Sequence, residues 1–199
     1  MNMTDPIYRA LEIIAKAASA SGAVWLVGGS AGLMLRGIEL TNPPRDLDLY
    51  ADERDARLLH AALREYAVDD QKLNVSGVYR SVLSHYRIEG VSVELVGGFV
   101  ITSGLSQYRV EVTAVLAQHS LSLTIGGCPV GVVPLAHELW FNVLRNRNDR
   151  VSLIAAAVGA EPGPHREAFC AIESRNRLSE ASVKHLHNLI ANMEARGTS

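Results

Sequence analysis

The sequence contains little lysine, little cysteine and no long apolar run. Its 199 residues carry 19 basic side chains, of which only Lys16, Lys72 and Lys184 are lysines. Phosphate is therefore expected to be bound by an arginine side chain or by backbone N–H groups. The two cysteines, Cys128 and Cys170, have neither metal-ligand spacing nor a disulfide framework, so we expect buried, reduced thiols and a cytoplasmic protein.

The lack of long apolar runs and of a positive net charge excludes further classes of protein. No apolar segment approaches membrane-spanning length, and acidic residues together with Lys16 make the N-terminal segment unlike a secretion signal. A net charge of −2 provides no basic field, so we expect neither a membrane partner nor an extended nucleic-acid surface. The length corresponds to one or two domains with an adequate core.

A glycine pair follows an apolar segment near the N-terminus. Residues 23–27 predict a buried strand, and Gly28, Gly29 and Ser30 follow it directly. Glycines allow backbone N–H groups to approach a phosphate closely. Residues 31–36 predict a short helix, with Ser30 as its N-cap and its dipole directed at that anion site.

Two aspartates alternate with leucines further along the chain. In Asp46-Leu47-Asp48-Leu49 the pattern predicts a strand with both carboxylates on one face. Their Cα atoms would lie ~7 Å apart, close enough for both side chains to reach one cation. Arg45, directly before them, is a candidate for phosphate binding, and an ion pair with an aspartate is the alternative.

A third acidic residue, Glu94, lies in a predicted hairpin. Residues 82–88 and 91–96 flank Glu89-Gly90, a good turn signal, and we expect Gly97-Gly98 to end the second strand. A glutamate on a half-buried strand usually faces only solvent. The two aspartates upstream favour a role for Glu94 in the same site.

These three elements resemble the nucleotidyltransferase superfamily. Its members have a Gly-Gly or Gly-Ser turn that opens a helix, an Asp-x-Asp strand and a third acidic residue on a neighbouring strand. The resemblance covers roughly residues 20–100, and the interval 31–45 is longer than in the family pattern. It implies an α/β (α+β) fold, with a mixed β-sheet flanked by helices and a helical C-terminal half.

The chain changes character after Pro134. From there helical patterns dominate, so we expect an α/β domain over residues 1–133 and a helical region over residues 134–199 packed on it. Arg145, Arg147 and Arg150 form a basic cluster in this region. They could meet a phosphate, but a solvated loop is the commoner fate of such a cluster.

The resemblance implies transfer of a nucleotide from a nucleoside triphosphate such as ATP to a hydroxyl group. Asp46 and Asp48 would bind Mg²⁺ or Mn²⁺, and Glu94 would bind a second metal or take the proton of the acceptor. Gly28, Gly29 and Ser30 would hold the phosphates. The acceptor, a small molecule, a protein or a tRNA end, is left open, as is the oligomeric state.

Two alternatives belong to other classes. An inactive nucleotidyltransferase-like domain would act as a binding or antitoxin subunit, and it would bind nucleotide without turnover. A plain α/β binding module with chance motifs would leave Asp46, Asp48 and Glu94 dispersed in space.

Overall fold

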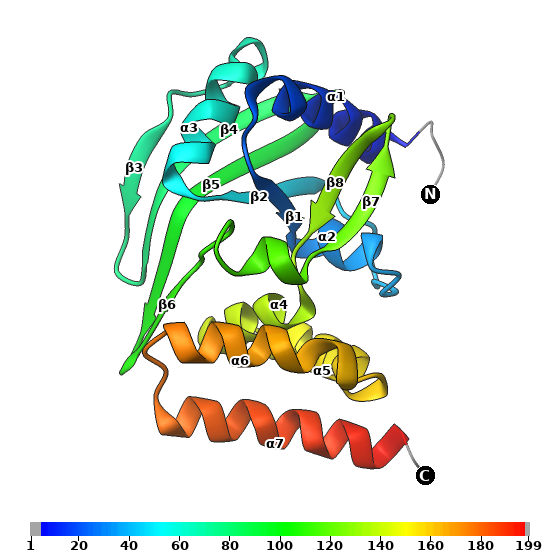
Figure 1. The fold of residues 1–199 in the computed structure, drawn as a ribbon, viewed down its shortest axis with the longest axis vertical. Helices are drawn as coiled ribbons and strands as arrows, with labels where there is room; N and C mark the ends of the chain where they lie inside the picture. Colours follow the sequence, from blue (N-terminus) through cyan, green and yellow to red (C-terminus); the bar gives the residue numbers. More distant parts are fainter. Residues whose placement is uncertain (1–4, 198–199) are drawn as a thin grey trace. The chain divides into compact units, whose positions relative to one another are not determined.

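The computed structural model describes residues 5–197, and these divide into two units (Figure 1). The first unit comprises residues up to 99 together with 110–133, and the second comprises 100–109 and the residues from 134 onward. The divisions fall within the long strand β5 (Val91–Ser103), after Arg109 and before Pro134.

A mixed sheet forms the centre of the first unit. Its strands follow the order β3-β4-β5-β2-β1-β8-β7, in which β2 runs parallel to β5 and antiparallel to β1, and β1 runs parallel to β8. This confirms the predicted mixed sheet. The strands are β1 (Trp25–Gly28), β2 (Asp46–Ala51), β3 (Lys72–Val75), β4 (Tyr79–Ile88), β5 (Val91–Ser103), β7 (Leu121–Ile125) and β8 (Cys128–Val132).

Helices supply the apolar core of this unit. Asp5 caps the first helix by accepting a hydrogen bond from the Ile7 N–H at 2.9 Å, and Gly22, with φ of 69°, ends it. Buried side chains of this helix and of α3 join inward-facing residues of β2 and β5 in one hydrophobic cluster. The helices are α1 (Pro6–Ser21), α2 (Gly29–Leu35) and α3 (Glu53–Ala62), with 3₁₀ turns η1 (Arg64–Tyr66) and η2 (Leu116–His119).

The hairpin of β4 and β5 is longer than the sequence pattern predicts. Its turn is confirmed, since Glu89 and Gly90 both have positive φ, as a two-residue turn requires. The expected break at Gly97-Gly98 is wrong, because β5 continues to Ser103. These glycines instead permit close packing of α3, since a Cβ at Gly97 would collide with the Cβ of Ala56.

The second unit is mainly helical, as expected after Pro134. Residues 100–103 of β5 pair with β6 (Ser106–Arg109), and the helices are α4 (Leu135–Leu144), α5 (Asn148–Ala160), η3 (Gly163–His165), α6 (Arg166–Arg175) and α7 (Glu180–Gly197). Between residues 5 and 197, no helix is long and apolar enough to cross a membrane.

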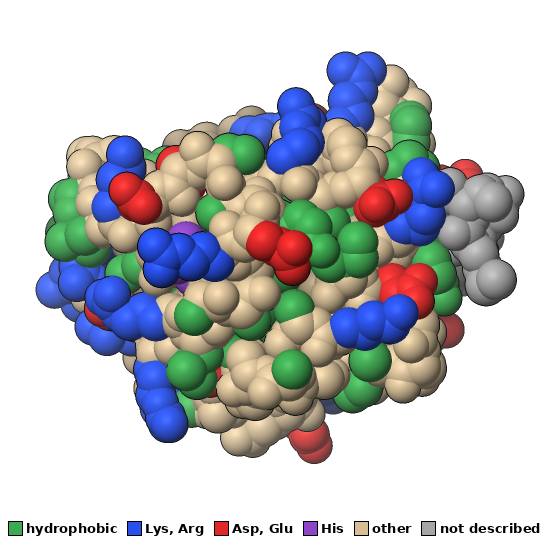
Figure 2. All heavy atoms as spheres, turned by 90° about the horizontal axis from the view of Figure 1, so that it is seen from above, with side chains coloured by type: hydrophobic (Ala, Val, Ile, Leu, Met, Phe, Trp, Pro, Cys, Tyr) green, Lys and Arg blue, Asp and Glu red, His purple; other side chains and the backbone are tan. Residues whose placement is uncertain are grey.

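Two arginines of the basic cluster and the two cysteines lie in ordinary structural surroundings. The Arg147 guanidinium pairs with Asp149 at 3.2 Å, and that of Arg145 lies 4.7 Å from the ring centre of Phe141. Cys170 is exposed and Cys128 is only half-buried, so the expectation of two buried thiols is wrong. On the face drawn in Figure 2, basic and acidic side chains lie interspersed among uncharged ones.

Candidate active site

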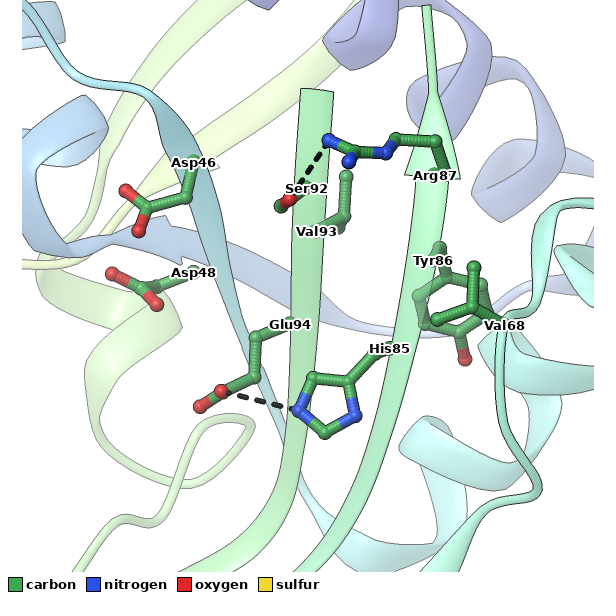
Figure 3. Close-up of a pocket in the computed structure, with 9 residues that line it drawn as sticks. All are labelled: Asp46, Asp48, Val68, His85, Tyr86, Arg87, Ser92, Val93 and Glu94. Atoms are coloured by element: carbon green, nitrogen blue, oxygen red, sulfur yellow. Dashed lines mark hydrogen bonds and ion pairs between the residues drawn. The ribbon is translucent and has the colours of Figure 1, made fainter. Parts of the chain in front are cut away.

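Strand β2 holds two carboxylates on one face. Leu47 and Leu49 are fully buried on the core side of the sheet, while Asp46 is exposed and Asp48 half-buried on the other side. Successive side chains of a strand point to opposite faces, so burying the two leucines on one face turns both aspartates to the other. Figure 3 shows both carboxylates directed to the same side of the strand.

Glu94 lies beside Asp48 on that face. The parallel pairing of β2 with β5 aligns Asp48 with Glu94, and the antiparallel pairing of β1 with β2 aligns Gly28 with Asp48. Val93 and Leu95 occupy the core side of β5. Gly28, Asp48 and Glu94 therefore form one row across three adjacent strands, which we call the acidic row.

A shallow pocket of about 270 Å³ opens over this face (Figure 3). Its floor is formed by β2, β4 and β5, and the segment after η1 forms one wall. The lining residues are Asp46, Asp48, Val68, His85, Tyr86, Arg87, Ser92, Val93 and Glu94. Such a pocket can admit a charged substrate from solvent to all three predicted acidic residues.

The glycine turn packs directly against Asp48. Gly29 has φ of 61°, a conformation that side chains other than glycine adopt at a cost. A Cβ built on Gly29 would lie 2.9 Å from the Cγ of Asp48 and nearer still to its Oδ2. Only glycine fits here, since the turn and the carboxylate occupy adjoining space.

The predicted cap of α2 is wrong. The helix begins at Gly29, with Gly28 as its N-cap, and Ser30 lies within the first turn. The positive φ of Gly29 starts the helical turn earlier than the sequence pattern indicated. Ser30 nevertheless follows the glycine pair beside the acidic row, so its predicted contact with phosphate stays a prediction.

Neither arginine close to the motif lines the pocket. Arg45 precedes β2 with an exposed side chain. The Arg36 guanidinium donates to the backbone carbonyls of Val133 at 2.7 Å and Val132 at 3.1 Å, which fastens the end of α2 to the end of β8. Phosphate binding by Arg45 stays a prediction.

A histidine that we did not identify from the sequence contacts Glu94. His85 Nε2 lies 3.5 Å from Glu94 Oε2. On the other side of the ring, Nδ1 lies 2.6 Å from Asp69 Oδ2, and the His85 backbone N–H donates to Asp69 Oδ1 at 2.7 Å. Counting back from a two-residue turn places residue 85 beside residue 94, so the hairpin pattern held a signal for His85. Asp69 lies in a stretch without periodicity, and no sequence signal indicates it.

Backbone and side-chain contacts fix the segment that carries Asp69. The Val68 N–H donates to the His85 carbonyl at 2.9 Å. The Gln71 amide donates to the Ser84 hydroxyl at 3.3 Å. This segment therefore follows β4 closely, and Asp69 is held against His85.

Within the described part of the chain, no group of three or more His, Cys, Asp or Glu side chains could hold a metal ion by itself. Glu94 is directed at His85, and this leaves Asp46 and Asp48 as the candidate metal-binding pair. Magnesium is commonly held by one or two carboxylates plus phosphates of the substrate, so such a pair fits a site that the substrate completes.

Comparisons of sequence identify no relative. No protein-family model matches the chain, and no curated protein matches it.

Comparisons of structure do identify the fold. A candidate nucleotidyltransferase from Thermotoga maritima superposes with a TM-score of 0.59 at 18% identity, over 71% of this chain and 86% of that one. The antibiotic-resistance factor ANT(2″)-Ia matches with a TM-score of 0.52 at 14% identity, over 86% and 99% of the two chains, in a complex with adenylyl-2″-tobramycin. Its solution structure matches with a TM-score of 0.52 at 15% identity, over 94% and 99%.

The chain has a nucleotidyltransferase fold. The resemblance inferred from the Gly-Gly-Ser and Asp-x-Asp motifs is thereby confirmed at the level of the fold. The roles of the individual site residues within this nucleotidyltransferase fold stay predictions.

The contact between Asp69 and His85 makes stability depend on pH. Burial opposes ionisation of Asp69, but hydrogen bonds from the His85 ring and backbone outweigh it, so the pKa of Asp69 lies below its ordinary 3.8. A lowered native pKa means that the contribution is present above the unfolded pKa and is lost as the pH falls through the native one.

We therefore expect Asp69→Asn to lower the free energy of unfolding at pH 7 by about 1 kcal/mol. Urea denaturation over a pH series should show this difference narrowing below about pH 4, where the wild-type carboxylate gains its proton. Asp70→Asn, at an exposed neighbouring position, is the control and should behave as wild type. A difference that stays constant down to acidic pH would contradict the assignment.

Proposed function

We propose that this protein is a metal-dependent nucleotidyltransferase that moves a nucleoside monophosphate from a nucleoside triphosphate to an acceptor hydroxyl. The acidic row carries this proposal, because it places the glycine turn, Asp48 and Glu94 side by side on three strands. The nucleotidyltransferase fold supports it.

Asp46 and Asp48 are proposed to hold Mg²⁺ or Mn²⁺ together with the triphosphate. Both carboxylates face the pocket from alternate positions of one strand, and oxygen donors of this kind suit these hard cations. The cation, when bound, neutralises charge on the phosphates and polarises the phosphorus that reacts. Without it, the carboxylates of the acidic row would repel a triphosphate.

The turn at Gly28, Gly29 and Ser30 is proposed to bind the β- and γ-phosphates. Glycine lets the backbone approach an anion without obstruction from a Cβ, and the Ser30 hydroxyl can donate a further hydrogen bond. Because Gly29 packs against Asp48, phosphates bound at the turn would lie next to the candidate metal pair.

Glu94 is proposed as the general base. The acceptor oxygen attacks the α-phosphorus, the bond from that phosphorus to the bridging oxygen breaks, and pyrophosphate leaves. The hydroxyl proton passes to the Glu94 carboxylate. The contact of Glu94 with His85, rather than with the two aspartates, favours this role over that of a metal ligand.

The nature of the acceptor is open. ANT(2″)-Ia, bound to adenylyl-2″-tobramycin, illustrates a small-molecule acceptor in a protein of this fold. At 14% identity the likeness concerns the fold, so a small molecule, a protein and a tRNA end all remain to be tested for this chain.

Nucleotide transfer is tested by incubating the full chain with each α-³²P-labelled triphosphate, Mg²⁺ and fractionated acceptors. Fractions would include small molecules, proteins and tRNA. The proposal predicts that one fraction gains label while pyrophosphate appears in equal amount. Tight nucleotide binding with no transfer to any fraction would instead support an inactive binding or antitoxin subunit.

Asp48→Asn is expected to remove metal-dependent nucleotide binding. The substitution removes one of two anionic metal ligands while the buried face of β2 is unchanged, so the fold should persist. Calorimetry should show triphosphate affinity in Mg²⁺ at least ~10-fold weaker than wild type, close to the wild-type value in a chelator. Asp70→Asn removes the same charge outside the pocket lining and should bind normally. Wild-type affinity that is unaffected by a chelator would contradict the metal role.

Gly29→Ala and Gly37→Ala form a matched pair of substitutions. Both glycines have positive φ, 61° and 78°, so each alanine should cost about 1–3 kcal/mol in backbone strain. Only the Cβ at Gly29 meets Asp48, whereas the space around Gly37 is open. We expect both variants to lose thermal stability, Gly29→Ala at least as much as Gly37→Ala, and we expect a loss of nucleotide affinity in Gly29→Ala alone. Equal nucleotide affinities in the two variants would contradict the proposal that the turn at Gly29 binds the nucleotide.

Glu94→Gln is expected to separate binding from chemistry. A base acts only when the acceptor hydroxyl attacks, so triphosphate affinity should stay close to wild type. Turnover should fall by ~10²-fold or more, which is the usual scale for a proton-transfer residue. Steady-state kinetics alongside calorimetry provide both values. Full turnover in this variant would contradict the role of Glu94 as the general base.

A further inference from the structure

His85 lines the pocket and contacts Glu94, while a second carboxylate, that of Asp69, contacts the other side of its ring. Its Nε2 lies 3.5 Å from Glu94 Oε2, and its Nδ1 lies 2.6 Å from Asp69 Oδ2. Figure 3 shows the ring edge directed at the Glu94 side chain. Both ring nitrogens are therefore engaged by carboxylates from different segments.

The ring has little freedom to turn. Asp69 uses both of its oxygens on His85, one for the ring and one for the backbone N–H at 2.7 Å. The backbone of the same segment is attached to β4, since the Val68 N–H donates to the His85 carbonyl at 2.9 Å. A rotation of the ring would break the 2.6 Å contact with Asp69, so Nε2 stays directed at Glu94.

Glu94 has more freedom than its partner. Its side chain is 45% exposed, and three rotatable bonds separate its carboxylate from the strand. A glutamate in this setting would otherwise sample several rotamers in solvent. A base that is displaced by about 1 Å from the acceptor hydroxyl can lose much of its effect, up to ~10²-fold.

We propose that His85, oriented by Asp69, is a positioning residue that holds the Glu94 carboxylate in place to receive the acceptor proton. This inference rests on the proposed nucleotide transfer and deepens it by assigning an outer pair of residues to the same site. In this role His85 acts through Glu94 rather than by its own contact with the triphosphate or the acceptor. Partners of this kind commonly contribute 10- to 100-fold, as the hydrogen-bond partners of metal-binding side chains do.

A purely structural His85 would only join the segment of Asp69 to β4. In that case the contact with Asp69 would matter for the protein, and the contact with Glu94 would not. An asparagine amide nitrogen reaches about as far as Nδ1, so His85→Asn keeps a donor for Asp69 and loses the contact with Glu94. A glutamine amide nitrogen reaches about as far as Nε2, so His85→Gln keeps a donor for Glu94 and loses the contact with Asp69. The two variants thus remove opposite contacts.

Steady-state kinetics on the full chain discriminate between the two roles. We expect His85→Asn to lower kcat by ~10-fold with the KM for triphosphate within about twofold of wild type, because Glu94 acts at the chemical step. His85→Gln should recover part of that loss, because it keeps a donor for Glu94 but lacks the contact with Asp69, and Asp70→Asn should match wild type. An equal loss in both variants, or a loss confined to His85→Gln, overturns the proposal.

A second measurement does not depend on turnover. In ¹⁵N NMR spectra of the histidine rings, Glu94→Gln should shift the Nε2 resonance of His85, and Ser92→Ala, on the same strand, should leave it unchanged. An unmoved Nε2 resonance overturns the proposal even in an active enzyme. If the wild type transfers no nucleotide although Nε2 responds to Glu94→Gln, the proposed function fails and the positioning role fails with it, while the contact stands.

Discussion

The parallel pairing of β2 with β5 is the constraint on which the candidate site depends. Its register aligns Asp48 with Glu94, and burial of Leu47 and Leu49 on β2 keeps that register. Fully burying such side chains contributes about 1.5–3 kcal/mol each, so a slip by one residue would cost several kcal/mol and would turn the aspartates into the core. The core thus determines where the charges face.

The pairing of β1 with β2 brings the glycine turn to the same place. Gly28 ends β1 opposite Asp48, and the positive φ of Gly29 starts α2 immediately beyond it. The chain therefore passes from strand to helix beside a carboxylate, with no side chain in between. A rigid sheet holds the acidic row, while the segment of Asp69 adds one further contact from outside the sheet.

Local patterns predicted where the three carboxylates of the candidate site would lie. Alternation placed Asp46 and Asp48 on one face, and the turn at Glu89-Gly90 placed Glu94 on a paired strand. The start of α2 and the length of β5 were wrong, because each depends on tertiary packing around a glycine: Gly29 against Asp48, and Gly97 against Ala56. Asp69 could not be found at all, since a long-range contact from an aperiodic loop leaves no pattern in the sequence.

The central claim is that the turn and the two aspartates bind one triphosphate together through a metal ion. A crystal structure of the full chain with Mg²⁺ and a non-hydrolysable triphosphate tests it most directly. The account predicts a metal ion between Asp46, Asp48 and the phosphates, with the β- and γ-phosphates against Gly28, Gly29 and Ser30. A triphosphate bound elsewhere, or one bound here without any metal contact to Asp46 or Asp48, would contradict it.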